Sequence, residues 1–160
     1  MKTSTVLPLL LLGAAGHGAN ALAQSGTFAA TGRMTTPRAG HTATLLTNGK
    51  VLIAGGTADF TRPIGPVPIA TAELYDPDTA TFAPTGDMTA PRFFHTATLL
   101  PDGRVLFAGG DPGQGLTHSK GAEIYDPSTG TFAPTGNMIG IHVCHEAHLL
   151  DNGKVLVACR

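Results

Sequence analysis

The sequence has few charges and little that would hold a nucleic acid or cross a membrane. Charged residues make up 13% of the 160 residues, the formal net charge is −1, and lysine and arginine form no cluster. Without a basic patch, neither nucleic acid nor an anionic membrane surface is expected as a partner. The apolar run at residues 6–15 is too short to span a bilayer.

Charge is scarcest at the start of the chain, where Lys2 is the only charged residue among the first 32. The apolar run follows it, and Ala21-Leu22-Ala23 has the small-x-small form of a signal-peptidase site. A buried N-terminal helix is the alternative, but three glycines would weaken it. We therefore expect a signal peptide over residues 1–23, cleavage near Ala23, and a secreted or periplasmic protein.

The most regular stretch is residues 91–110, which read PRFFHTATLLPDGRVLFAGG. Asp102 and Gly103 separate two apolar runs, and an Asp-Gly step favours a two-residue type I′ turn between antiparallel strands. The predicted hairpin pairs Leu100 with Val105, so the threonines of the first strand share a face with Val105. Neither face is charged, and we expect other parts of the protein to pack on both faces.

This hairpin occurs three times, marked by His41, His95 and His145 at spacings of 54 and 50 residues. Between the hairpins lie two copies of a second strand pair, at residues 72–88 and 122–138. Self-similarity at this period is the signature of a repeat protein. Each unit is predicted to hold four short strands: the hairpin, a variable loop, a Tyr-Asp-Pro strand, a turn and a Thr-Phe-Ala-Pro-Thr-Gly strand.

The repeat resembles the kelch motif, and its amino-acid sequence is similar to those of secreted bacterial kelch proteins and of the propeller domain of galactose oxidase. The resemblance covers residues 26–160 and implies an all-β fold, in which blades of four antiparallel strands surround a central axis. The resemblance rests on paired glycines, a Tyr-Asp pair and a later aromatic residue. That aromatic residue is Phe here, where the family usually has Trp. They are Gly55-Gly56, Gly109-Gly110, Tyr75-Asp76, Tyr125-Asp126, Phe82 and Phe132.

Counting strands predicts an incomplete ring. The chain divides into a blade-closing strand (26–32), two blades (37–88 and 91–138) and a half blade (142–160), which is about two and a half to three blades. A propeller needs about four to eight blades to close. We expect either a fragment of a longer propeller or copies that associate to complete the ring.

The resemblance also implies that loops after the second and fourth strands share one rim. The two long ones, at residues 57–71 and 111–121, differ by four residues, and length variation confined to one rim points to a ligand face. Arg38, Arg92 and His142 are the candidate binding residues there, because guanidinium groups clamp carboxylates or sugars. The alternative for the arginines is an internal bond to Glu73, to Glu123 or to a backbone carbonyl.

Other candidates have structural interpretations. Tyr75 and Tyr125 invite comparison with the copper ligands of galactose oxidase, but both occupy the repeated position and no other tyrosine exists. The three repeat histidines are expected to be hydrogen-bonded core groups. Asp76 and Asp126 precede proline and are expected to accept turn N–H bonds.

The third unit departs from the pattern. His142, Cys144, Glu146 and His148 alternate along one strand face and are competent metal ligands. We prefer the alternative, which is drift in a terminal repeat, and we expect no metal or cofactor. Cys159, placed opposite Glu146, is ~7–8 Å from Cys144 between Cα atoms, beyond easy disulfide reach. Two free thiols are therefore expected.

The function predicted is a secreted, non-enzymatic binding module that recognises carbohydrate or protein through its loop rim. The alternatives are part of a galactose-oxidase-like copper-radical oxidase, or an incomplete gene product without activity of its own.

Overall fold

A computed structural model of the chain describes residues 30–59, 61, 65–113, 120–140 and 146–158. The chain forms two units, Met1–Ala30 and Thr31–Arg160, and all ten strands belong to the second. The predicted signal peptide and most of the predicted first strand lie outside the described residues. Residues 30–32, the described end of that strand, have no strand pairing. No helix occurs in the described part, and hence none there that is long and apolar enough to cross a membrane.

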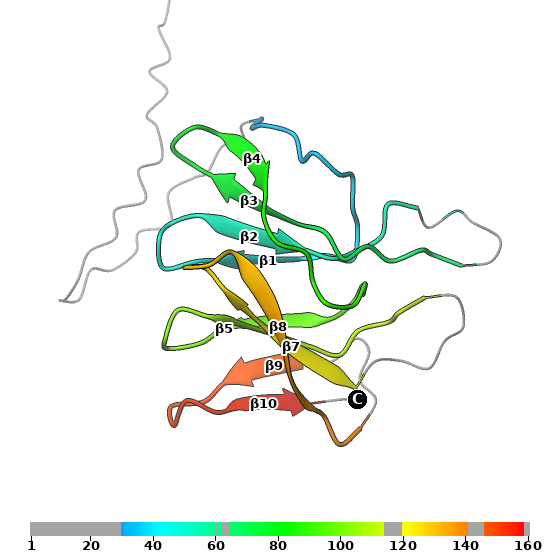
Figure 1. Cartoon of the computed structure of the whole chain (residues 1–160), viewed down its shortest axis with the longest axis vertical. Coiled ribbons are helices and arrows are strands. Elements are labelled where there is room, and N and C mark those ends of the chain that lie inside the picture. Colours follow the sequence, from blue (N-terminus) through cyan, green and yellow to red (C-terminus); the bar gives the residue numbers. More distant parts are fainter. Residues whose placement is uncertain (1–29, 60, 62–64, 114–119, 141–145, 159–160) are drawn as a thin grey trace, which may run out of the picture. The chain divides into compact units, whose positions relative to one another are not determined.

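Three antiparallel sheets follow one another along the chain (Figure 1). The first sheet has the order β1-β2-β3-β4, the second β5-β6-β7-β8, and the third pairs β9 with β10. The all-β class and the count of four, four and two strands are as expected, while the three sheets do not close into a ring. The strands are β1 Thr42–Leu45, β2 Val51–Ala54, β3 Ala72–Asp76, β4 Thr81–Pro84, β5 Thr96–Leu99, β6 Val105–Ala108, β7 Gly121–Asp126, β8 Thr131–Asn137, β9 Glu146–Leu149 and β10 Val155–Ala158.

The hairpin register corrects the sequence prediction by one residue. Leu99 pairs with Val105, while Leu100 donates its N–H to Arg104 O at 2.8 Å, so the loop has three residues instead of two. Gly103 alone in this loop has a positive φ, +86°. Such a loop is a type I turn closed by a glycine bulge. The Asp102 carboxylate stabilises it by accepting the Arg104 N–H at 3.1 Å.

Because of the one-residue shift, each side chain of the second strand lies on the opposite face of the hairpin from the one predicted. Phe107 pairs with Ala97, and Val105 with Leu99, so these four residues share a face; the threonines of β5 lie on the other. The shift recurs in the third hairpin, where Ala158, and not Cys159 as expected, pairs with Glu146. Cys144 and Cys159 lie outside the described residues, so the expected free thiols stay a prediction.

The core lies between the first and second sheets. The first sheet contributes Leu52, Ala54 and Ala72, and the second contributes Val105, Phe107 and Tyr125, all of them buried. These side chains come from the inner strands and from the Tyr-Asp strand, which explains why both faces of the repeated hairpin are apolar. Burial of such a face is the main favourable term in stacking one sheet on the next.

Polar contacts repeat from sheet to sheet and fix their spacing. His95 Nε2 lies 3.0 Å from Thr42 Oγ1, which joins the second sheet to the first. The Thr85 hydroxyl lies 2.8 Å from that of Tyr125, and Gly86 donates its N–H to Gly130 O at 3.0 Å. The same two contacts occur one repeat earlier, between Thr31 and Tyr75 at 2.6 Å and between Gly32 N and Ala80 O at 3.2 Å.

Candidate functional site: the loop rim

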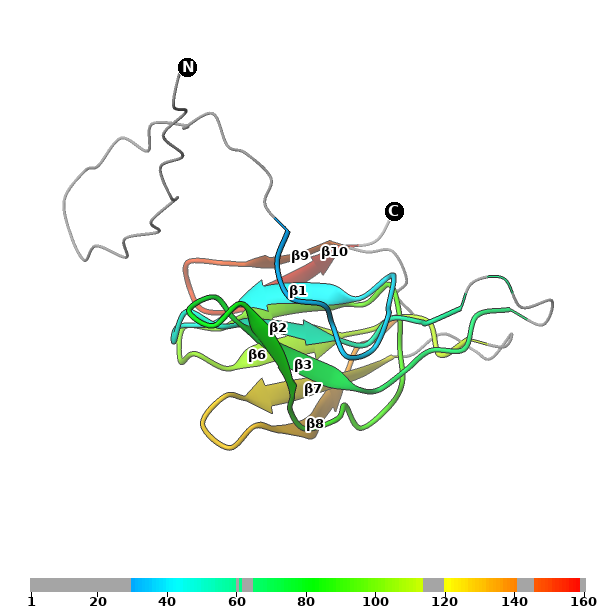
Figure 2. The ribbon, with the colours of Figure 1, turned by 90° about the horizontal axis from the view of Figure 1, so that it is seen from above.

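The connections after β2 and after β6 leave the first and second sheets on one side, opposite the tight hairpin turns. Figures 1 and 2 both show the described parts of these loops projecting side by side. Isolated β-bridges join each of them to the segment that precedes its sheet: Ala39 pairs with Thr57, and Phe93 pairs with Asp111. The loops that follow the second strand of a sheet and the loops that follow the fourth strand therefore meet along one rim, as predicted.

Polar contacts hold the rim loops in shape. The Thr57 hydroxyl donates to Val67 O at 2.8 Å, across the base of the longer loop. Asp59 Oδ1 accepts the backbone N–H of Thr61 at 2.7 Å and its hydroxyl at 2.6 Å. A Cβ on Gly113 would lie 2.6 Å from Pro66 O. The two long loops therefore touch each other where they leave the sheets.

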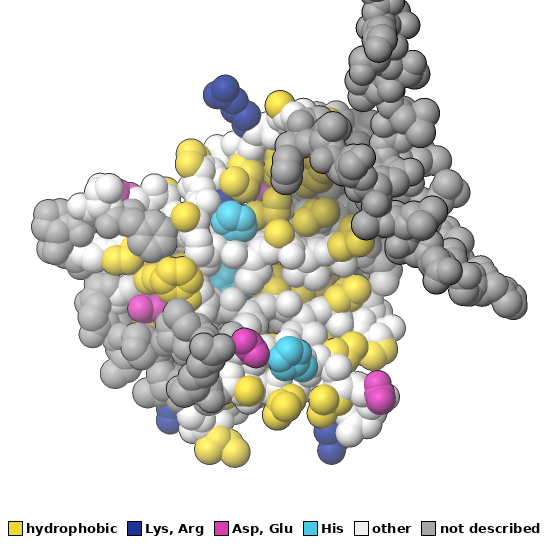
Figure 3. All heavy atoms as spheres, turned by 180° about the vertical axis from the view of Figure 1, so that it is seen from behind, with side chains coloured by type: hydrophobic (Ala, Val, Ile, Leu, Met, Phe, Trp, Pro, Cys, Tyr) yellow, Lys and Arg dark blue, Asp and Glu magenta, His cyan; other side chains and the backbone are white. Residues whose placement is uncertain are grey.

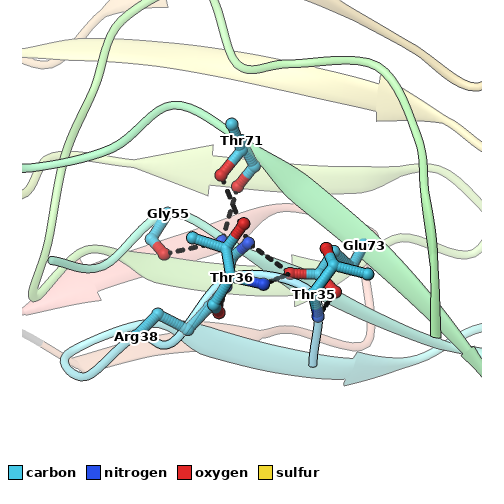
Figure 4. A network of polar contacts seen from close by, with 6 residues as sticks. All are labelled: Thr35, Thr36, Arg38, Gly55, Thr71 and Glu73. Carbon is cyan, nitrogen blue, oxygen red and sulfur yellow. Dashed lines mark hydrogen bonds and ion pairs between the residues drawn. The ribbon is translucent and has the colours of Figure 1, made fainter. Parts of the chain in front are cut away.

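Arg38 lies beneath this rim with its guanidinium group pointing into the protein (Figure 4). Nη1 donates to Gly55 O at 3.0 Å and Thr71 O at 2.7 Å. Nη2 donates to Thr71 Oγ1 at 3.2 Å and Glu73 Oε1 at 2.6 Å, and Nε donates to Thr36 O at 3.4 Å. All five N–H groups of this arginine thus have acceptors inside the chain.

Glu73 completes the network from β3. Its carboxylate accepts the backbone N–H groups of Thr35 at 2.7 Å and Thr36 at 3.1 Å (Figure 4). Burial by itself disfavours the carboxylate, but the hydrogen bonds from Thr35 and Arg38 outweigh it and lower the pKa of Glu73. Glu73 is therefore ionised near neutral pH and pairs with the Arg38 guanidinium.

Arg92 repeats the arrangement in the second sheet. Its Nη1 donates to Gly109 O at 2.7 Å and Gly121 O at 2.9 Å, and its Nη2 lies 2.9 Å from Glu123 Oε1. Glu123 also accepts the Thr89 N–H at 2.6 Å. Burial lowers the pKa of Arg92, and the charge of Glu123 opposes that shift.

The internal ion pairs given as the alternative for Arg38 and Arg92 are confirmed. Each buried pair ties the start of a sheet to the paired glycines and to the Tyr-Asp strand, and so positions the rim loops. Ligand binding by these arginines is not tested by the structure and stays a prediction. His142, the third predicted binding residue, lies outside the described residues.

Phe94 is a rim residue that the sequence reasoning missed. It has φ +55° and is 42% exposed, and its ring lies 4.9 Å from that of Phe93, centroid to centroid. The equivalent residue in the first repeat is Gly40, with φ +67°. A bulky residue in this conformation is an outlier, and strain of this kind costs about 1–3 kcal/mol. Aligning PRAGHT with PRFFHT would have revealed the aromatic residue at a glycine position.

Among the remaining candidates, His95 and the turn aspartates have the structural roles that were expected, whereas His41 is half-buried and lies outside the core. His145 lies outside the described residues. His95 is buried and bonded to Thr42, whereas burial and the charge of Arg38 lower the pKa of His41, so its imidazole is neutral at pH 7. The side-chain oxygen Oδ1 of Asp126 accepts the Ser128 N–H at 2.8 Å, and Asp76 does the same for Asp78 at 3.0 Å.

Both tyrosine hydroxyls bond to threonines of the preceding repeat, which confirms their interpretation as structural aromatics. In the third unit, Glu146 and His148 are described, and they lie on one exposed face with 3.6 Å between Oε2 and Nε2. His142 and Cys144, the other two candidate ligands, lie outside the described residues. No cluster of three metal-ligating side chains occurs in the part of the chain that the structure describes.

Charged side chains are scattered singly over the face in Figure 3, without a concentration of one sign. The sequence matches no protein-family model and no curated protein.

Proposed function

We propose that the chain is part of a secreted kelch-type β-propeller that binds carbohydrate through its loop rim. The observation that carries the proposal is Phe94, an exposed aromatic ring held in a strained backbone conformation at that rim. Strained residues cluster at ligand sites, where the surrounding structure holds them in place.

The surroundings of Phe94 suit a sugar. An aromatic ring offers a flat apolar face, and the buried ring of Phe93 packs edge-on against this one, at an interplanar angle of 61°. Phe93 exchanges backbone hydrogen bonds with Asp111, at 3.2 and 2.8 Å, where a long rim loop begins. The residue that precedes Phe94 is therefore bonded to the start of a polar loop, and an apolar surface with a few adjacent polar groups is typical of small-molecule sites.

Arg38 and Arg92 have a supporting role in this proposal. Their guanidinium groups hold the base of the rim through Glu73, Glu123 and backbone carbonyls. The ligand contacts are made above them, by Phe94 and the loops.

The test is a glycan array followed by titration of the best glycan. It uses the mature chain, whose N-terminus at Gln24 is checked by mass spectrometry of the exported protein. Phe94→Gly should weaken binding at least tenfold while the thermal midpoint stays the same or rises, because glycine adopts this φ without strain. Leu45→Ala, which trims an exposed apolar side chain on β1, is the control and should bind like wild type. A Phe94→Gly variant with undiminished glycan binding, or a rim that captures only protein, would refute the proposal.

A further inference from the structure

The last strand in each four-stranded sheet is an edge strand. β4 ends the order β1-β2-β3-β4 and β8 ends the order β5-β6-β7-β8, and each pairs with one neighbour alone among the described strands. An edge strand presents backbone N–H and C=O groups outside the ladder, and these groups are a template for a further strand. Both edges would therefore attract another chain unless some feature of the sequence prevents it.

Charged side chains are one common protection of an edge strand, and both strands lack them. β4 reads TFAP and β8 reads TFAPTGN, and neither contains Lys, Arg, Asp or Glu. β8 is also accessible, because most of its residues are exposed. The two strands instead share a proline at the same place in the repeat, Pro84 in β4 and Pro134 in β8.

The pairing of β3 with β4 shows where an N–H of residue 84 would point. Thr85 donates its N–H to Ala72 O at 3.0 Å, and Pro84 pairs with Glu73 at the next step of the ladder. Hydrogen-bonded and non-hydrogen-bonded pairs alternate in an antiparallel ladder, so Glu73 and Pro84 form a non-hydrogen-bonded pair. The nitrogen of Pro84 therefore faces away from β3, toward the open edge.

Pro134 has the same orientation in β8. It pairs with Glu123, and a proline keeps its place in a ladder without losing a bond only where its nitrogen points outward. Because orientations alternate along a strand, the N–H of Phe132 also faces the open edge, while that of Ala133 faces β7. Pro134 thus removes one of the outward donors of β8.

A second irregularity occurs in β8 and not in β4. The ladder between β7 and β8 shifts by one residue between Gly121 and Glu123, so β8 contains an extra residue opposite this step. Such a bulge twists an edge and interrupts further pairing. β4 has four residues and ends at Pro84, whereas β8 has seven and continues beyond Pro134. The longer edge therefore has both interruptions.

We propose that Pro84 and Pro134 prevent the outer edges of the sheets from pairing with a second copy of this chain. Both edges begin with the same residues, TFAP, and such a strand can pair antiparallel with its own copy across a two-fold axis. The outward N–H and C=O groups of one β8 would then bond to those of the other. Proline removes one donor from each strand and places its ring where the partner strand would lie.

The inference goes beyond the ligand proposed for the loop rim and does not depend on it. The rim is formed by loops at one side of the sheets, whereas both prolines lie within strands. A failure of glycan binding would therefore leave this inference unaffected.

Sedimentation velocity of the mature chain and its variants, over one series of concentrations, tests the proposal. Pro134→Val should associate at concentrations roughly tenfold or more below those of wild type, because valine suits a strand and restores an outward N–H to each copy. Ala133→Val is the matched control. It adds the same side chain where the N–H already faces β7, and it should sediment like wild type. Pro84→Val makes the same test at β4 if Pro134→Val fails to fold.

Hydrogen exchange locates the contact and also tests the wild-type protein. In wild type the Phe132 amide should exchange faster than the Ala133 amide, because the first faces solvent and the second is bonded to β7. In Pro134→Val the Phe132 amide should become protected as the protein concentration rises.

Three outcomes would overturn the inference. The first is a folded Pro134→Val that remains monomeric wherever wild type does. The second is association of this variant without added protection of the Phe132 amide, because the copies would then meet elsewhere. The third is a wild-type Phe132 amide that becomes protected as concentration rises, because the edge would then pair in spite of its proline.

Discussion

A buried arginine is stable only when its N–H groups find acceptors and its charge finds a partner. Arg38 meets both conditions through acceptors on Gly55, Thr71 and Glu73, which are 17, 33 and 35 residues away in sequence, and Arg92 repeats the pattern. Each arginine joins the segment before a sheet to the end of its second strand and to its Tyr-Asp strand. Removal of one guanidinium group therefore leaves a buried carboxylate without its opposite charge, and it removes one hydrogen bond from each of several carbonyls.

Arg92→Ala should consequently destabilise the protein by about 3–5 kcal/mol, the usual cost of breaking a buried pair from one side. The measurement is urea unfolding followed by circular dichroism at pH 7. Arg104→Ala is the matched control, because Arg104 pairs with Asp102 in an exposed ion pair, and it should change the midpoint little. Equal midpoints for the two variants would show that the Arg92 network contributes nothing to stability.

At the scale of single elements, the hairpin turns decide which face each strand buries. In the Asp102–Gly103 turn and its two counterparts, a side chain accepts the N–H two residues later: Asn48 from Lys50 at 3.1 Å, Asp102 from Arg104 at 3.1 Å, and Asn152 from Lys154 at 3.0 Å. The following glycine then takes the positive φ. This three-residue loop recurs in all three hairpins and keeps Val105 and Phe107 on the same buried face.

Gly103→Ala should lower stability by about 1–2 kcal/mol, which is the cost of a left-handed conformation for a residue with a Cβ. Steric contact adds little, because the nearest atom to the new Cβ would be Thr47 Oγ1 at 3.4 Å. Calorimetry of the variant beside Gly136→Ala checks this. Gly136 has no positive φ, so its alanine variant should melt like wild type, and a similar melting point for both would contradict the assignment of strain.

The sequence was sufficient to predict the strands and their order, because three aligned hairpins and two Tyr-Asp pairs leave little choice of pairing. It was insufficient for the register, since an Asp-Gly step suits both a two-residue turn and the bulged loop that forms around Gly103. The sequence left two interpretations of Arg38 and Arg92 open, internal ion pairs and ligand-binding groups. Burial of the side chains favours the ion pairs, and burial is known only from the structure. Phe94 was missed, since its strain is visible only when its backbone angle is known or when it is aligned with Gly40.

On the scale of the whole second unit, the sheets behave as a short one-dimensional stack. Each sheet contacts its sequence neighbours, so its stability depends on its own strands and on the adjacent interfaces. The second sheet has a neighbour on both sides and contains the fully buried Val105, Phe107 and Tyr125. The third sheet has two described strands, and Leu149 and Leu156 are exposed on it.

Hydrogen exchange of the full chain should therefore show a gradient, with the β6 amides slowest and the β9 and β10 amides fastest. Local opening of β9 and β10 breaks the hydrogen bonds of one hairpin and exposes one interface, whereas exposing β6 breaks pairing on both of its edges and both of its packed faces. Amide exchange read by nuclear magnetic resonance at constant pH gives the comparison residue by residue. Equal protection of β10 and β6 would mean that the stack unfolds as one cooperative unit, and the gradient would be wrong.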